Sequence, residues 1–134
     1  MEGKDHGTDF IRSVHSEADA MNSSNVFVEA ERLPWEEVGK GLKRKILGYD
    51  PDLMMVSVVF EQGAVGALHS HPHRQVTFVA EGKFEVRIAS DTRKLEEGDS
   101  FIVPSGVEHG VVALKKGTLI DVFTPAREDF LRRA

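Results

Sequence analysis

The chain contains no cysteine among its 134 residues. Disulfides and zinc sites built on thiolates are therefore excluded, and cysteine usage cannot indicate the redox compartment. Hydrophobic residues make up 40% of the chain, which is enough to build one core. The length suits a single domain.

Long apolar segments are absent as well. No stretch has the roughly 20 consecutive apolar residues that a membrane-spanning helix needs. The N-terminal stretch, residues 1–24, has neither the basic start nor the apolar centre of a signal peptide. We therefore expect no membrane partner and, by default, a cytoplasmic location.

The chain also lacks an excess of positive charge, because its formal net charge is -5 at pH 7. A nucleic-acid surface normally needs a basic patch, so no nucleic-acid partner is expected. The longest basic cluster is Lys43-Arg44-Lys45, which lies between apolar residues. This short cluster favours a solvated strand face over a binding patch.

Polar residues dominate residues 1–24, which predict a flexible or loosely attached extension, whereas residues 25–134 predict one domain. Short β-rich runs with frequent turn signals favour an all-β sandwich or barrel, and no helix–strand alternation suggests an α/β sheet. A hairpin is expected at Glu81-Gly82. Thr124 and Pro125 resemble the N-cap and first residue of a short C-terminal helix over residues 126–134. The expected strands lie within residues 25–33, 42–52, 53–63, 75–91, 92–114 and 117–125.

Three of the six histidines lie in one short segment, GALHSHPHRQVTF, at residues 66–78. On an extended strand His69 and His71 point to the same side, and Gln75 returns to it if Pro72 bends the chain only slightly. Two adjacent imidazoles pack poorly in a core but are good metal ligands. His109 is the natural further ligand, since it follows the turn PSG.

An isolated His-x-His pair also fits a polar surface, so this pair alone does not define a metal site. His73 follows Pro72 and precedes Arg74. We expect it to be exposed or to lie behind the ligands, without binding the metal itself.

The spacing of the surrounding glycines makes the metal site more specific. The first motif runs Gly63, five residues, His69-x-His71, three residues, Gln75, six residues, Gly82; the second runs Gly98, five residues, Pro104-x-Gly106, two residues, His109. This pattern resembles both motifs of the cupin superfamily, which usually has glutamate at the position of Gln75 and often asparagine at that of Ala113. The resemblance implies a single-domain cupin, a jelly-roll β-barrel that holds one divalent metal ion. By motif position the ligands would be His69, His71, Gln75 and His109.

Gln75 changes the expected charge of the site. Three imidazoles and an amide are neutral, so a divalent ion would keep its full charge, which favours an anionic guest and Lewis-acid chemistry. Nickel, zinc, iron and manganese all accept imidazole, and the sequence does not choose among them. No organic cofactor is expected.

A second feature is Asp121, a carboxylate inside the apolar run TLIDVFTP. On strand parity Leu119, Asp121 and Phe123 share one face, so Asp121 is expected to point into a cavity or an interface. It could be an acid/base group or a structural carboxylate paired with a turn or an arginine. Arg127 could bind a carboxylate or be solvated, and Phe123 could be a wall of the site or simply core.

These residues make the resemblance more specific. From about Leu42 to Leu131 the chain resembles the small cupins of pectin and alginate breakdown. This resemblance implies conversion of 4,5-unsaturated uronate monosaccharides to linear 5-keto-4-deoxyuronate, with Asp121, Phe123 and Arg127 as catalytic residues. The partner would then be a small acidic sugar. Two alternatives remain: a cupin dioxygenase that uses iron and O2, and a cupin that binds a sugar or metal without turnover. A homodimer is expected on family grounds, with residues 25–33 able to cover or exchange an edge strand.

Overall fold

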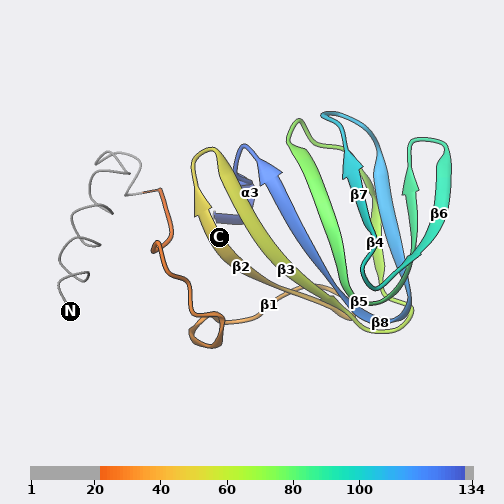
Figure 1. The fold of residues 1–134 in the computed structure, drawn as a ribbon, viewed down its shortest axis with the longest axis horizontal. Coiled ribbons are helices and arrows are strands. Elements are labelled where there is room, and N and C mark those ends of the chain that lie inside the picture. The colour runs from red at the N-terminus through yellow and green to blue at the C-terminus, as the bar shows by residue number, and fades with distance from the viewer. Residues whose placement is uncertain (1–21, 132–134) are drawn as a thin grey trace.

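The computed structural model describes residues 22–131, so the predicted extension lies outside the described residues up to residue 21. The described chain is all-β, as predicted, and forms one antiparallel sheet that curves into a jelly roll (Figure 1). Its elements are η1 (Ala30–Arg32), β1 (Glu36–Gly39), β2 (Leu42–Asp50), β3 (Leu53–Phe60), β4 (Val65–His69), β5 (Arg74–Ile88), β6 (Asp91–Glu96), β7 (Ser100–Val103), β8 (His109–Thr124) and the short helix α3 (Glu128–Leu131).

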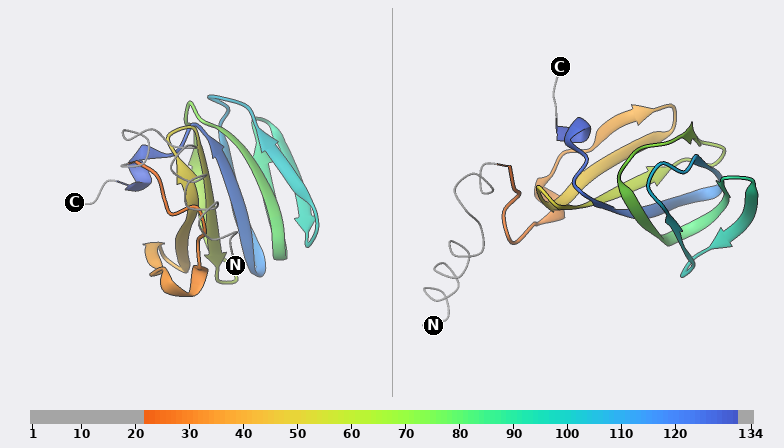
Figure 2. Two further views of the ribbon diagram at one scale, coloured as in Figure 1. Left: turned by 60° about the vertical axis from the view of Figure 1, so that its left-hand side comes forward. Right: turned by 90° about the horizontal axis from the view of Figure 1, so that it is seen from above.

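Two long strands, β5 and β8, form the spine of the sheet and pair along almost their whole length. Each changes its second partner near its middle. The first part of β5 pairs with β7 and the rest with β6, while β8 pairs first with β4 and then with β3. This exchange of partners bends the sheet around an interior, which is visible from above in Figure 2. The sequence predicts a break between the end of the 92–114 segment and a separate strand over residues 117–125. This break is absent, because both stretches belong to the single strand β8.

Gly82 lies where the spine bends, and the hairpin predicted at Glu81-Gly82 is not formed. The register between β5 and β8 shifts between Val79 and Phe84, and Gly82 has a φ of 91°. A Cβ added at Gly82 would lie 2.6 Å from the carbonyl oxygen of Lys116. Gly82 therefore permits a bulge in β5 and a close approach between β5 and β8, both of which continue past this point. In the sequence alone, a glycine with this role looks the same as a glycine in a turn.

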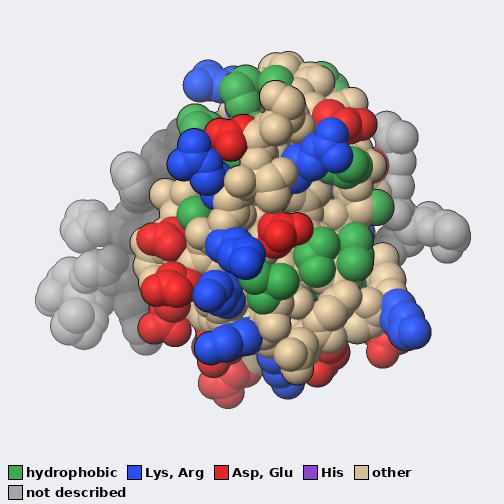
Figure 3. All heavy atoms as spheres, turned by 90° about the vertical axis from the view of Figure 1, so that its right-hand side faces the viewer, with side chains coloured by type: hydrophobic (Ala, Val, Ile, Leu, Met, Phe, Trp, Pro, Cys, Tyr) green, Lys and Arg blue, Asp and Glu red, His purple; other side chains and the backbone are tan. Residues whose placement is uncertain are grey.

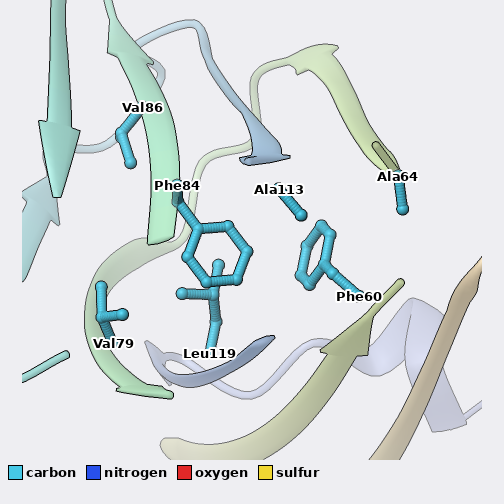
Figure 4. Close-up of a cluster of buried hydrophobic side chains, with 7 residues drawn as sticks. All are labelled: Phe60, Ala64, Val79, Phe84, Val86, Ala113 and Leu119. Atoms are coloured by element: carbon cyan, nitrogen blue, oxygen red, sulfur yellow. The ribbon is translucent and has the colours of Figure 1, made fainter. Parts of the chain in front are cut away.

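The core fills the interior of this curved sheet in two parts. Phe60 and Phe84 meet edge to face, with their ring centroids 5.1 Å apart. Figure 4 shows these two side chains within the cluster. Val79, Val86, Ala113 and Leu119 surround them. A second cluster of Met54, Val56, Phe123 and Ala126 lies towards the C-terminus. Alternation along β3, β5 and β8 places these apolar side chains on one face of each strand.

Near the chain ends, the strand predicted over residues 25–33 is wrong, whereas the short C-terminal helix is confirmed but starts later than predicted. Residues 25–33 do not form a strand: η1 interrupts them, and the edge strand is instead β1. Thr124 ends β8, and α3 begins only at Glu128. The amide of Ala126 donates to the carbonyl oxygen of Pro51, so the chain is tied to the β2–β3 turn before it can become helical. Of the predicted helix, residues 132–134 lie outside the described residues.

On the face shown in Figure 3, lysine and arginine side chains are interspersed with acidic ones. Among the described residues, no helix has the length and apolar character to cross a membrane.

Candidate metal centre and its cavity

Three histidines meet at one end of the interior. His69 ends β4, His109 begins β8, and these two residues pair directly across the strands. His71 lies in the loop between β4 and β5 rather than on a strand with His69, so the predicted common strand face is wrong although the side chains converge. Their ring nitrogens lie within 4.8 Å of one another, and among the described residues these histidines form a group that could hold a metal ion.

The hydrogen bonds of the histidines leave the same ring nitrogen of each available. Nδ1 of His69, His71 and His109 contacts the backbone carbonyl oxygen of Ala67, His73 and Val107, at 2.9, 3.0 and 2.9 Å. A carbonyl oxygen only accepts, so each Nδ1 carries the proton and each Nε2 keeps its lone pair. Such backbone contacts are the usual support of metal-binding histidines.

Among the described residues, two of these Nε2 atoms have no donor that would satisfy them. Nε2 of His109 is buried and has no hydrogen-bond partner among the described residues. Nε2 of His71 lies 3.1 Å from Oε1 of Gln75. Two acceptors that face each other at this distance repel unless a cation lies between or beside them. The donor set therefore fits a divalent ion held by the three imidazoles and the Gln75 oxygen.

Gln75 connects the histidines to Asp121. Its Nε2 donates to Oγ1 of Thr77 at 2.9 Å and approaches Oδ1 of Asp121 at 3.4 Å, while the Thr77 hydroxyl donates to the same Oδ1 at 2.6 Å. Thr77 and Asp121 are paired residues on β5 and β8. Burial is the main cause that raises the pKa of the Asp121 carboxyl to about 6, against the lowering effect of Thr77.

Two of the three histidines have pKa values below the ordinary value for histidine. Burial lowers the pKa of His71 to about 4, and the neighbouring Arg127 and His109 charges act in the same direction. Burial also lowers the pKa of His109. Metal ligands must be unprotonated, so these shifts favour cation binding at neutral pH.

His69, His109, Gln75 and Asp121 line a cavity of about 170 Å3 that reaches Arg127 and Phe130. Arg127 is buried, but its guanidinium is already held by Asp129: Nε and Nη2 donate to the two carboxylate oxygens at 3.1 and 2.9 Å. Phe123 belongs to the second core cluster and also lines the cavity.

His73 is not part of the histidine group. Its backbone oxygen accepts from His71, and its own Nδ1 is buried without a partner among the described residues. The prediction missed Arg44, which lines the cavity from β2. Its neighbours Lys43 and Lys45 stack on Trp35 instead. Strand alternation, which separates Arg44 from both lysines, was the signal that could have found it.

The jelly roll and the histidine group define a cupin. A model of the cupin domain family matches residues 56–123, half of the chain, and the chain belongs to this family. Within it, the pectin degradation protein KdgF of Dickeya dadantii (strain 3937) is 49% identical over 107 residues, which cover 78% of this chain and 96% of that protein.

Solved structures agree with this membership. An RmlC-like cupin from Shewanella frigidimarina NCIMB 400 has a TM-score of 0.80 at 46% identity, and the match covers 82% of this chain and 99% of that one. KdgF from Halomonas sp. has a TM-score of 0.76 at 40% identity, with 80% and 99% covered. The chain is thus a small cupin similar to KdgF over most of its length.

Proposed function

We propose that the protein converts 4,5-unsaturated uronate monosaccharides, the products of pectin or alginate lyases, to linear 5-keto-4-deoxyuronate. The observation that carries this proposal is the hydrogen-bonded arrangement of Gln75, Thr77 and Asp121 beside the three histidines, which puts one acid/base group next to a cation-binding set. The likeness to proteins called KdgF, one of them a pectin degradation protein, supports a role in unsaturated uronate metabolism.

The reaction is an isomerisation and needs no oxidant or reductant. The anomeric hydroxyl loses its proton as C1 becomes an aldehyde, and the bond between C1 and the ring oxygen breaks. The ring oxygen becomes the C5 ketone, and the electrons of the C4–C5 double bond take a proton at C4. One proton leaves the sugar and one enters it, so a single group can perform both transfers.

Asp121 is that group in our proposal. With a pKa of about 6 it is mainly a carboxylate at neutral pH but is readily protonated, as a group that accepts and then returns a proton should be. The Thr77 hydroxyl fixes the orientation of its carboxyl. Arg127 gives positive charge to the cavity wall, and Phe123 bounds the sugar ring.

His69, His71, Gln75 and His109 would hold the metal ion, and none of these ligands is charged when the histidines are neutral. When bound, a divalent ion would supply Lewis-acid polarisation and a positive field that attracts the carboxylate of the substrate. The proposal leaves open which of nickel, zinc, iron or manganese serves.

The test follows the ultraviolet absorbance of the conjugated double bond of unsaturated galacturonate mixed with purified protein. We expect the absorbance to disappear faster with protein than without it, and a chelator to abolish the difference. An oxygen electrode on the same sample should show no consumption. Oxygen uptake in step with substrate loss would instead support a dioxygenase, and an unchanged rate would leave a binding role.

Asp121→Asn is expected to lower kcat by about a hundredfold or more, the size of a general acid–base contribution. The matched control is Asp52→Asn in the exposed β2–β3 turn, which should leave kcat unchanged. Metal content by elemental analysis should be equal in all three proteins. Near-normal turnover of Asp121→Asn with intact metal content would remove Asp121 as the proton carrier.

Two further expectations accompany this function and stay predictions: a cytoplasmic location, which fractionation would test, and a homodimer, which light scattering would test. The strand expected at residues 25–33 is not formed, so an exchange through that strand is no longer part of the expectation.

A further inference from the structure

Arg44 on β2 is a second arginine that lines the cavity. It pairs with Glu36 on β1 and with Val58 on β3 in the strand register. Its side chain is only 18% exposed, and its guanidinium carbon lies 3.8 Å from the centroid of the Phe130 ring. An arginine this buried requires a partner or a ligand.

Glu36 supplies that partner and leaves part of the guanidinium available. Nε of Arg44 donates to Oε1 of Glu36 at 3.3 Å. Within the described residues, the Arg44 side chain donates no other hydrogen bond. The N–H groups on its two terminal nitrogens therefore remain available to a ligand. The side chain of Glu36 is 21% exposed and comes from the strand beside Arg44, which fixes the direction of the guanidinium.

Arg127 differs from Arg44 in this respect. Asp129 binds Arg127 through two parallel hydrogen bonds, the geometry in which an arginine would otherwise bind the carboxylate of a ligand. Both arginines stack on the ring of Phe130, with Arg127 at 4.2 Å from its centroid, and both line the cavity. Of the two, Arg44 has the paired terminal donors that a carboxylate needs.

We propose that Arg44, oriented by Glu36, binds the carboxylate of the acidic sugar and gives the cavity its preference for uronates over neutral sugars. This proposal rests on the proposed function, because it assumes a uronate in the cavity. Arg127 then stabilises the bound carboxylate of the sugar through its positive charge, because its guanidinium already donates two hydrogen bonds to Asp129. Arg44 is a binding residue in this scheme and takes no part in proton transfer.

The experiment compares Arg44→Gln with wild type on unsaturated galacturonate, both loaded with metal. Loss of a charge-assisted hydrogen bond in a buried site predicts a rise in KM of about ten- to hundredfold. We expect kcat to change by less than about threefold, because Asp121 is untouched. Lys43→Gln, which removes the same charge from the outer side of the same strand, is the matched control and should leave KM unchanged.

Equilibrium binding of D-galacturonate and D-galactose, measured by calorimetry, separates this inference from the proposed function. Neither sugar has the C4–C5 double bond, so the measurement does not depend on turnover. Wild type should bind galacturonate more tightly than galactose, and Arg44→Gln should lose that preference while Lys43→Gln keeps it. A wild type that binds galacturonate without turning over the unsaturated sugar would refute the reaction but not the role of Arg44.

A second variant keeps the inference testable if Arg44→Gln fails to fold. Glu36→Gln retains the arginine but weakens its orientation, and we expect a rise in KM of about three- to tenfold, with kcat nearly unchanged. Thermal unfolding monitors the fold of each variant. Unchanged KM and unchanged galacturonate preference in the folded variants would overturn the proposal.

Discussion

At the residue scale, Gln75 performs two tasks that a glutamate could not perform together. Its Oε1 faces His71 as an acceptor, and its Nε2 donates to Thr77 and approaches Asp121. A glutamate would place two carboxylates about as close as the 3.4 Å now measured between Gln75 and Asp121. Like charges at that distance cannot both ionise without a large pKa shift. The neutral amide of Gln75 therefore keeps Asp121 able to titrate near neutrality.

Gln75→Glu tests this reasoning. The added carboxylate should bind the metal more tightly and, as a neighbouring negative charge, raise the pKa of Asp121. If ionised Asp121 starts the reaction, the acid limb of the kcat profile moves to higher pH and turnover at neutral pH falls. Gln62→Glu, an exposed position, is the control. An acid limb that stays in place, with metal saturating, would contradict a role for Asp121 in that limb.

Individual residues of the site were predictable only where a spacing motif or strand alternation identified them. The spacing of the histidines and Gln75 predicted a group that the structure brings together. The parity of β8 predicted that Asp121 points inward with Leu119 and Phe123, and these side chains line one cavity. Arg44 is not predicted when Lys43-Arg44-Lys45 is read as one basic cluster, whereas strand alternation places it on the face opposite to its two flanking lysines.

At the element scale, the all-β character of the chain was predictable, but the bends and the exact set of strands were not. A run such as residues 75–91 has the same alternation whether it turns back at Gly82 or continues through a bulge. What decides is the partner: β5 and β8 pair with each other on both sides of Gly82, and that contact is between residues far apart in sequence. The predicted edge strand at residues 25–33 failed for a similar reason, since Ser24 instead exchanges hydrogen bonds with Tyr49.

Gly82→Ala tests the strand crossing. A Cβ here meets the backbone of Lys116 and Gly117, at 2.6 and 2.7 Å, whereas a Cβ at Gly98 meets nothing within 4 Å. The two glycines have nearly equal φ, 91° and 95°. Gly98→Ala therefore carries the same backbone strain without the clash. We expect Gly82→Ala to lower the free energy of unfolding by about 1–3 kcal/mol more than Gly98→Ala, measured by urea unfolding. Equal losses would mean that the close approach does not matter.

At the scale of the whole molecule, the stability of the metal-free protein carries opposite contributions from the site. The pKa of His71 is lowered to about 4, so the unfolded chain binds a proton there first and stability falls as pH drops from about 6.5 to 4. Asp121 acts in reverse. Its pKa is raised to about 6, so the folded protein takes up a proton before the unfolded chain does, and stability rises as pH falls towards 3.8.

Asp121→Asn should separate these contributions. Above about pH 6 the buried carboxylate destabilises the folded metal-free protein, and a neutral amide that still accepts from Thr77 removes that cost. The variant should therefore unfold at a higher urea concentration than wild type at about pH 8, and the difference should vanish below about pH 4. Wild type should show a flatter dependence over that window because His71 and Asp121 oppose each other, whereas the variant should lose stability steadily. Asp52→Asn should follow wild type throughout. A variant less stable than wild type at about pH 8 would mean that the Asp121 carboxylate stabilises the fold. That result would contradict the proposal that this carboxylate lowers stability and serves proton transfer.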